Sequence, residues 1–126
     1  MLIVQKYGGT SVGNLERIEE VAKRVIATKD AGHDVVVVVS AMSGVTNQLI
    51  EYAEHFAGVQ PQSADMDMLL SSGERVTSSL LSIALNSKGY KAVSFSGDMA
   101  GIITNNDFTK ARIIDIDGAK MKEALK

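Results

Sequence analysis

The chain has 126 residues, of which 45% are hydrophobic, and this length and composition predict one domain with a single core. Its formal net charge of -2 gives no general reason to expect a nucleic-acid or membrane partner, and the lack of cysteine excludes disulfides and thiolate metal sites. The opening residues lack the pattern of a secretory signal, and no apolar run is as long as a membrane span. We therefore expect a cytoplasmic protein that binds neither nucleic acid nor a membrane.

A strand, a glycine loop and an amphipathic helix are predicted in order at the start of the chain. Residues 1–4 form a short apolar run that is typical of a strand covered in a parallel sheet. Apolar residues then recur at helical spacing over residues 14–31, and Gly32 offers a C-terminal stop. Between them, residues 6–14 hold three glycines. Their backbone amides, the helix start and the charge of Lys6 are suited to hold phosphate.

Two familiar phosphate motifs do not match this loop. Gly8 and Gly13 have the spacing of a P-loop, but the required Lys-Ser/Thr pair does not follow, and the Rossmann fingerprint lacks its second glycine. The local pattern alone therefore leaves two interpretations open. Either the loop cradles phosphate, or it is a tight turn in which Thr10 and Ser11 cap the helix while Lys6 is solvated.

Five consecutive valines at residues 35–39 predict a second strand, covered on both faces. Together with the preceding strand and helix they make a βαβ unit with a parallel sheet. The right-handed crossover of such a unit brings Lys6 and Ser40 to the same carboxyl edge, where ligands bind in open α/β sheets.

A second loop of small residues and hydroxyls, residues 40–47, follows this strand and leads into a helical segment. Taken alone, the loop is more typical of ordinary helix capping by Ser43 or Thr46. Its predicted place beside the first loop favours the other interpretation, in which it forms a second set of hydrogen-bond donors facing the first.

A long helix is predicted after a break at residues 58–63, and it begins with the acidic residues 65–67. Its middle, residues 71–79, is small and polar, which lowers intrinsic helix propensity by about 1 kcal/mol for the glycine alone. Either this composition allows a close approach to a ligand or sheet, with Glu74 pointing into the site, or the helix packs on another helix with Glu74 and Arg75 on the surface.

The last third of the chain predicts short strands and a final helix. Residues 91–95 are strand-like, and residues 102–104 and 111–115 predict two further strands joined as a hairpin. Asp117 is placed to cap a last helix that runs to Lys126.

No metal ligand is assigned. The two histidines lie apart from each other without a cysteine or second histidine at ligand spacing. The aspartates near the C-terminal end are more typical of turns and caps than of a magnesium site.

Four segments, in order, carry a resemblance to a known family. They are KYGGTSVGN at 6–14, VVVVSAMSGVTN at 36–47, LLSSGERVTSSLLS at 69–82 and GIITNNDFTKARIIDID at 101–117. On these segments the chain resembles the N-terminal part of the aspartate kinases, within the amino acid kinase fold. The resemblance covers nearly the whole chain.

The resemblance implies an α/β fold, a three-layer αβα sandwich with a mainly parallel central sheet. It also implies that residues 1–126 are the amino-acid-substrate part of an amino acid kinase domain. The nucleoside-binding half and the regulatory ACT domains of the family are then absent from this chain. We expect 126 residues of this kind to be inactive alone, and we expect the parent protein to be a homo-oligomer through its kinase domain.

The implied reaction is transfer of phosphate from ATP, with Mg²⁺, to the side-chain carboxylate of L-aspartate. The product is 4-phospho-L-aspartate, at the start of the pathway to lysine, threonine and methionine. By similarity, Lys6 is the catalytic cation, and the phosphates lie against Lys6, Gly8, Gly9, Thr10, Ser11 and Ser40. The amino acid contacts Ser40, Thr46 and Glu74, and Glu74 pairs with its α-ammonium. No residue is assigned to the metal.

Two alternatives remain from the sequence. One is another amino acid kinase, acting on glutamate, N-acetylglutamate, carbamate or UMP, although the SGER segment favours aspartate. The other is a non-catalytic module that binds anions.

Overall fold

A computed structural model describes residues 1–57 and 62–126 of the chain. Its first half is a βαβ unit: β1 (Leu2–Tyr7), the short 3-10 helix η1 (Gly9–Val12), α1 (Leu15–Asp30) and β2 (Asp34–Val39). The two strands are parallel, with Leu2 opposite Asp34 and Tyr7 opposite Val39. The predicted parallel pair is therefore confirmed.

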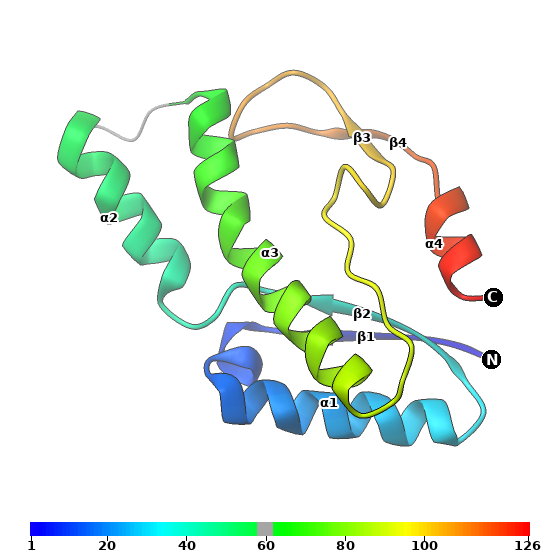
Figure 1. Cartoon of the computed structure of the whole chain (residues 1–126). Helices are drawn as coiled ribbons and strands as arrows, with labels where there is room; N and C mark the ends of the chain where they lie inside the picture. The colour runs from blue at the N-terminus through cyan, green and yellow to red at the C-terminus, as the bar shows by residue number, and fades with distance from the viewer. Residues whose placement is uncertain (58–61) are drawn as a thin grey trace.

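Two helices follow the βαβ unit. They are α2 (Val45–Ala57) and the long α3 (Ala64–Ser87), which begins after a capping serine, Ser63. Figure 1 shows α3 crossing the βαβ unit, with α2 beside it. The predicted break at residues 58–63 falls largely outside the described residues, but the predicted acidic first turn of α3 is confirmed.

One core joins α1, α3 and the inward face of the two strands. Its members are apolar and buried: Val12, Ile18, Val21, Ala22, Val25, Leu81 and Leu85. They meet the inward valines of β2, which lie at alternate positions because successive strand side chains point to opposite faces.

The other face of the sheet has no covering layer among the described residues. Leu2 and Val4 on β1 and Val38 on β2 are about half exposed or more. The expectation of strands covered on both faces is therefore wrong for the described chain, since its helices α1 and α3 share one side. The α/β class is confirmed, whereas a three-layer sandwich is not seen in this part of the chain.

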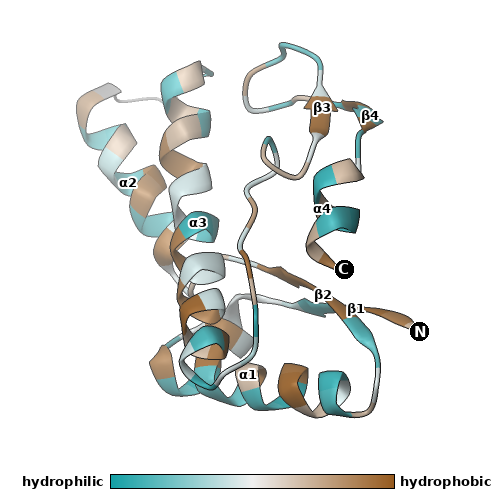
Figure 2. Cartoon of the chain, turned by 45° about the vertical axis from the view of Figure 1, so that its right-hand side comes forward, coloured by the Kyte–Doolittle hydropathy of each residue, from teal (hydrophilic) through white to brown (hydrophobic). Residues whose placement is uncertain are grey.

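The last part of the chain is an antiparallel hairpin, β3 (Ile102–Thr104) and β4 (Ile113–Ile116), followed by α4 (Ala119–Ala124). The predicted hairpin is confirmed, with its second strand shifted by two residues at its start. The predicted last helix forms but is shorter, and its N-cap residue is Gly118 in place of Asp117; Asp117, one residue earlier, accepts a hydrogen bond from the N–H of Ala119. Figure 2 shows both strands of the hairpin as mainly hydrophobic, with a hydrophilic part in β4.

The predicted strand at residues 91–95 does not form. Instead the side chain of Asn86, near the end of α3, takes the place of a strand partner. Its Nδ2 donates to the carbonyl of Ala92 at 2.8 Å, and its Oδ1 accepts from the N–H of Ala92 at 3.4 Å. This segment therefore has strand-like composition but no neighbouring strand.

Candidate functional site

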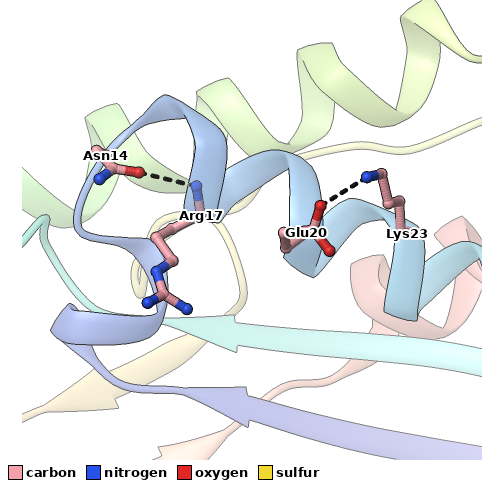
Figure 3. Close-up of polar contacts among 4 residues, drawn as sticks. All are labelled: Asn14, Arg17, Glu20 and Lys23. Atoms are coloured by element: carbon pink, nitrogen blue, oxygen red, sulfur yellow. Dashed lines mark hydrogen bonds and ion pairs between the residues drawn. The ribbon is translucent and has the colours of Figure 1, made fainter.

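The first loop turns tightly between β1 and α1. The N–H of Ser11 donates to the carbonyl of Gly8 at 3.0 Å, and Val12 is fully buried in the core below the loop. Helix α1 is capped by Asn14, whose Oδ1 accepts from the N–H of Arg17 at 2.9 Å, as Figure 3 shows. Thr10 and Ser11 do not cap the helix, which removes one ground for reading the loop as a simple turn.

On the surface of α1, charged side chains face solvent as the sequence predicts. Lys23 donates to Glu20 at 2.6 Å, three residues away, in place of the four-residue pairs that helical spacing also allows (Figure 3). Both side chains are well exposed, so this pair belongs to the solvated face and not to the site.

The second loop leaves β2 beside the first. The N–H of Ser40 donates to the carbonyl of Tyr7, the last residue of β1, at 3.2 Å, which extends the strand pairing into the start of the second loop. A Cβ atom at Gly9 would lie 3.1 Å from the carbonyl oxygen of Ala41, tighter than most Cβ contacts. Glycine in the first loop therefore allows the two loops to approach closely.

The third wall comes from the polar middle of α3. Glu74 Oε1 accepts a hydrogen bond from the N–H of Ala41 at 3.4 Å, and Gly73, which is buried, faces the same residue. A Cβ atom at Gly73 would also meet Val45 and Leu49 of α2, so the small residue at this point of α3 allows a close approach both to the second loop and to a neighbouring helix. Arg75 turns away to Asp98, 3.6 Å distant.

Glu74 and Arg75, which are adjacent on α3, have different partners: Glu74 bonds the second loop and Arg75 pairs with Asp98. The hydroxyl of Ser96, and more weakly the guanidinium of Arg75, lower the pKa of Asp98 below its ordinary value. Arg75 thus forms its ion pair with Asp98, outside the pocket. Glu74 is the one carboxylate among the described residues that line it.

The three segments line an open, shallow pocket of about 410 Å³ at the carboxyl end of the parallel strands. Its lining consists of small, hydroxyl-bearing and polar residues: Gly9, Thr10, Ser40, Ala41, Met42, Ser43, Gly44, Thr46, Asn47 and Glu74. Five of the eight predicted site residues are in this list. Because two loops and a helix from distant parts of the sequence supply them, the site exists only in the folded chain.

Three predicted residues, Lys6, Gly8 and Ser11, are not part of the pocket lining. Lys6 is exposed on β1, opposite Val38, on the sheet face that the described helices leave open. Successive side chains of a strand point to opposite faces, and Lys6 lies between the inward residues Gln5 and Tyr7. The outward position of Lys6 could therefore have been predicted from the sequence.

Asn47 is a lining residue that was not predicted. It lies in the first turn of α2, at the end of the hydroxyl-rich segment, so its place in that segment was the available signal. Ser43, expected at most as a cap, also lines the pocket.

A second hollow of about 480 Å³ lies at the loop between β3 and β4. It is lined by Gln62, Asn106, Asp107, Phe108, Lys110 and Arg112, none of which was a predicted site residue. Next to it, Asp67 in the first turn of α3 accepts from the N–H of Thr109 at 3.0 Å.

No cluster of three or more histidine, cysteine or acidic side chains that could hold a metal ion occurs in residues 1–57 and 62–126. The pocket has one carboxylate, so its lining does not fit a magnesium site by itself. Within the same described ranges, none of the helices combines the length and the apolar composition of a membrane span.

Comparison with known proteins gives a consistent assignment. The model of the amino acid kinase family matches residues 1–126. An aspartate kinase of Pseudomonas fluorescens is 52% identical over 126 residues, which cover 99% of this chain and 30% of that protein. The chain therefore spans about a third of the length of the curated relatives it matches.

Solved structures show the same likeness. The crystal structure of an aspartate kinase from Synechocystis superposes with a TM-score of 0.75 at 47% identity, covering 81% of this chain and 17% of that one. E. coli aspartokinase III in complex with aspartate and ADP superposes with a TM-score of 0.71 at 22% identity, covering 99% and 36%. At that identity the second likeness supports the fold alone.

Proposed function

Since the chain belongs to the amino acid kinase family, we propose that it forms the acceptor-binding and phosphate-binding part of an aspartate kinase. The observation that supports this most is the meeting of the two loops and Glu74 around one pocket. The full protein would transfer phosphate from ATP to the side-chain carboxylate of L-aspartate, giving 4-phospho-L-aspartate and ADP, as the first step towards lysine, threonine and methionine. The likeness to aspartate kinases at about half identity supports this acceptor over the other acids of the family.

In the proposed reaction the acceptor needs no base. An aspartate side chain has a reference pKa of about 3.9 and is ionised at neutral pH, so it can attack the γ-phosphorus directly while ADP leaves. The obstacle is repulsion between an anionic acceptor and an anionic nucleotide. The protein must therefore position the reactants and neutralise their charge.

We assign these tasks to the residues of the pocket and its rim. The amides of Gly8 and Gly9, and the hydroxyls of Thr10, Ser11 and Ser40, hold phosphate oxygens. Small residues and hydroxyls in the lining fit this use, since backbone amides are ready donors to phosphate.

Recognition of the amino acid is assigned to the other side of the pocket. Glu74 binds the α-ammonium, and Thr46 and Ser40 contact the rest of the acceptor. Glu74 suits the first role because it is the lining carboxylate, with no basic partner among the described residues.

Lys6 is proposed as the catalytic cation, although it lies outside the lining. It stands two residues before Gly8, at the same end of β1 as the pocket, and its long side chain has no ion-pair partner in the described chain. Reaching the transferred phosphate requires its ammonium to turn towards the loops when the nucleotide is bound.

We also propose ATP with Mg²⁺ as the phosphate donor. The E. coli relative's structure contains ADP and aspartate, which supports this pair of ligands. Because the described residues do not form a magnesium site, no step is assigned to the metal here. The remaining length of the relatives is proposed to supply the nucleoside contacts, the third layer of the sandwich on the open face of the sheet, and the oligomer contacts.

The first test is aspartate-dependent release of ADP by the full-length protein. We expect Lys6→Ala to lower kcat at least about 100-fold, because loss of one donor to a developing charge has effects of that order. Lys91→Ala is the matched control, because Lys91 is also an exposed lysine but does not line the pocket; this variant should leave kcat within twofold. Equal effects of the two substitutions would contradict the role of Lys6.

An acceptor panel completes the test. Aspartate, glutamate, N-acetylglutamate, carbamate and UMP are offered to the same enzyme, and aspartate should give the highest kcat/KM. Turnover of another acceptor would identify a different amino acid kinase. Binding of inorganic phosphate in calorimetry without turnover of any acceptor would instead support a non-catalytic anion module.

A further inference from the structure

Ala41 is the residue at which the three walls of the pocket meet. Its exposed fraction is 4%, its carbonyl faces Gly9 and its N–H donates to Glu74. Its methyl group faces Gly73, the residue that precedes Glu74 on α3. A single small side chain therefore separates the second loop from the helix that carries the acceptor-binding carboxylate.

The space between Ala41 and Gly73 is too small for one more methyl group. A Cβ atom added at Gly73 would lie 2.8 Å from the Cβ of Ala41 and 3.4 Å from Cγ1 of Val45. Carbon atoms in contact are about 3.5–4.0 Å apart, so the helix and the loop would have to separate by roughly 0.7 Å or more. A Cβ atom moves with its backbone, and neither side can yield by rotating a side chain.

From this contact we infer that Ala41 and Gly73 are positioning residues that set the length of acceptor accepted by the pocket. They fix the distance between Glu74 and the second loop. The inference rests on the proposed function, in which the acceptor's ammonium binds Glu74 and its carboxylate meets the phosphate held by the loops. Neither residue need touch the substrate, since both act through the position of Glu74.

Acceptor length matters because both ends of the amino acid are held. Aspartate and glutamate differ by one methylene group between the α-carbon and the reacting carboxylate. One methylene group is discriminated by about 10–200-fold in a well-fitted pocket. A pocket widened by a fraction of that length should hold aspartate less well and should reject glutamate less strongly.

The first variant is Gly73→Ala in the full-length protein. We expect KM for aspartate to rise about tenfold, KM for ATP to change less than twofold, and the ratio of kcat/KM for aspartate to that for glutamate to fall. Gly97→Ala is the matched control, because an added Cβ at Gly97 meets nothing within 4 Å. An unchanged KM for aspartate in Gly73→Ala would overturn the inference.

The second variant exchanges the sizes of the two residues. Ala41→Gly combined with Gly73→Ala removes the methyl group with which the new one collides. We expect this double variant to recover KM for aspartate to within about threefold of the wild type and to restore the preference over glutamate. A double variant as impaired as Gly73→Ala alone would overturn the inference, because the added methyl group would then act elsewhere.

The melting temperature separates failure of this inference from failure of the proposed function. Alanine is the better helix former, so Gly73→Ala should raise the melting temperature in the Ala41→Gly background. In the wild-type background the collision should lower it. A rise in both backgrounds would overturn the contact itself. If the change in melting temperature caused by Gly73→Ala has opposite signs in the two backgrounds while the wild-type protein does not phosphorylate aspartate, the contact is confirmed. That result would nevertheless refute the proposed function and with it the role of the contact in acceptor choice.

Discussion

The βαβ unit with α3 and the C-terminal hairpin both contain segments rich in β-branched apolar residues, valine and isoleucine in the first and isoleucine in the second, but they bury these residues very differently. Ile18 on α1 has an exposed fraction of 2%, whereas Ile114 on β4 has one of 67%. All four residues of β4 are exposed, including those on both faces of the strand. Apolar pattern alone therefore does not determine burial, which requires a second element to cover the residue.

The hairpin is held mainly by its own strand pairing and by few contacts to the rest of the chain. One of these is the hydrogen bond from Thr109 to Asp67 on α3. Thr109 has a φ of 62°, in the left-handed region that β-branched residues rarely adopt. The first half, in contrast, gains its stability from packing around α1.

The largest expected effect is on the free energy of unfolding, when one isoleucine in each region is replaced by alanine. Ile18→Ala should lower the free energy of unfolding by about 2–5 kcal/mol, because it leaves a cavity in the core. Ile114→Ala, the same change on β4, should lower it by less than about 0.5 kcal/mol. Equilibrium urea unfolding measures both, and similar losses would show that the hairpin is buried in solution.

A smaller effect is expected where the regions are joined. Asp67→Ala removes the acceptor for the Thr109 N–H and should cost about 1 kcal/mol more than Asp65→Ala. Asp65 lies in the same first turn of α3, so both variants lose the same favourable interaction with the helix dipole.

Amide hydrogen exchange gives the direct measurement for this contact. The Thr109 amide should exchange faster in Asp67→Ala and at the wild-type rate in Asp65→Ala. Equal rates in the two variants would mean that the carboxylate of Asp67 does not hold the hairpin loop.

The smallest expected effect is a pH-dependent change in stability that comes from the hydrogen bond between Tyr90, which follows α3, and Asp30 at the end of α1. The hydroxyl of Tyr90 donates to both carboxylate oxygens of Asp30, at 2.8 and 2.9 Å, and this bond raises the pKa of Tyr90 above its ordinary value. A raised folded-state pKa adds stability below the unfolded-state value of about 10, and that stability is lost as pH rises through the folded value.

Tyr90→Phe should therefore be less stable than the wild type between pH 7 and 9, with the difference shrinking above about pH 10. Thermal unfolding across this range measures it. Tyr52→Phe, which alters an exposed tyrosine on α2, should show no such pH dependence. A constant difference for Tyr90→Phe at all pH values would contradict the assigned hydrogen bond.

The sequence was sufficient for the elements that depend on local pattern. The first helix was predicted over residues 14–31 and is observed at Leu15–Asp30, followed by Gly32 with a φ of 88°. Helical spacing and a glycine stop specify this element without its neighbours. The strand-like residues 91–95, in contrast, needed a partner strand, and the Asn86 side chain satisfies the backbone of Ala92 instead.

The site was predictable in its parts but not in its shape. The carboxyl-edge rule placed Ser40 beside the first loop, and the odd composition of α3 drew attention to Glu74. The rule does not say which side chains turn inward, and so Lys6 was expected in a pocket that it does not line. Contacts such as that between Ala41 and Gly73 depend on the helix crossing, which no local pattern contains.

The burial of Val12 has a consequence for how strongly the first loop can bind an anion. Val12 fixes η1 to the core, so the loop has its conformation before any ligand arrives. Ordering a flexible backbone costs roughly 1–2 kcal/mol per residue. A loop ordered by folding does not incur that cost on binding, and its dipoles need no reorientation as charge moves during phosphate transfer. A valine that never touches the ligand can thus increase the loop's affinity for it.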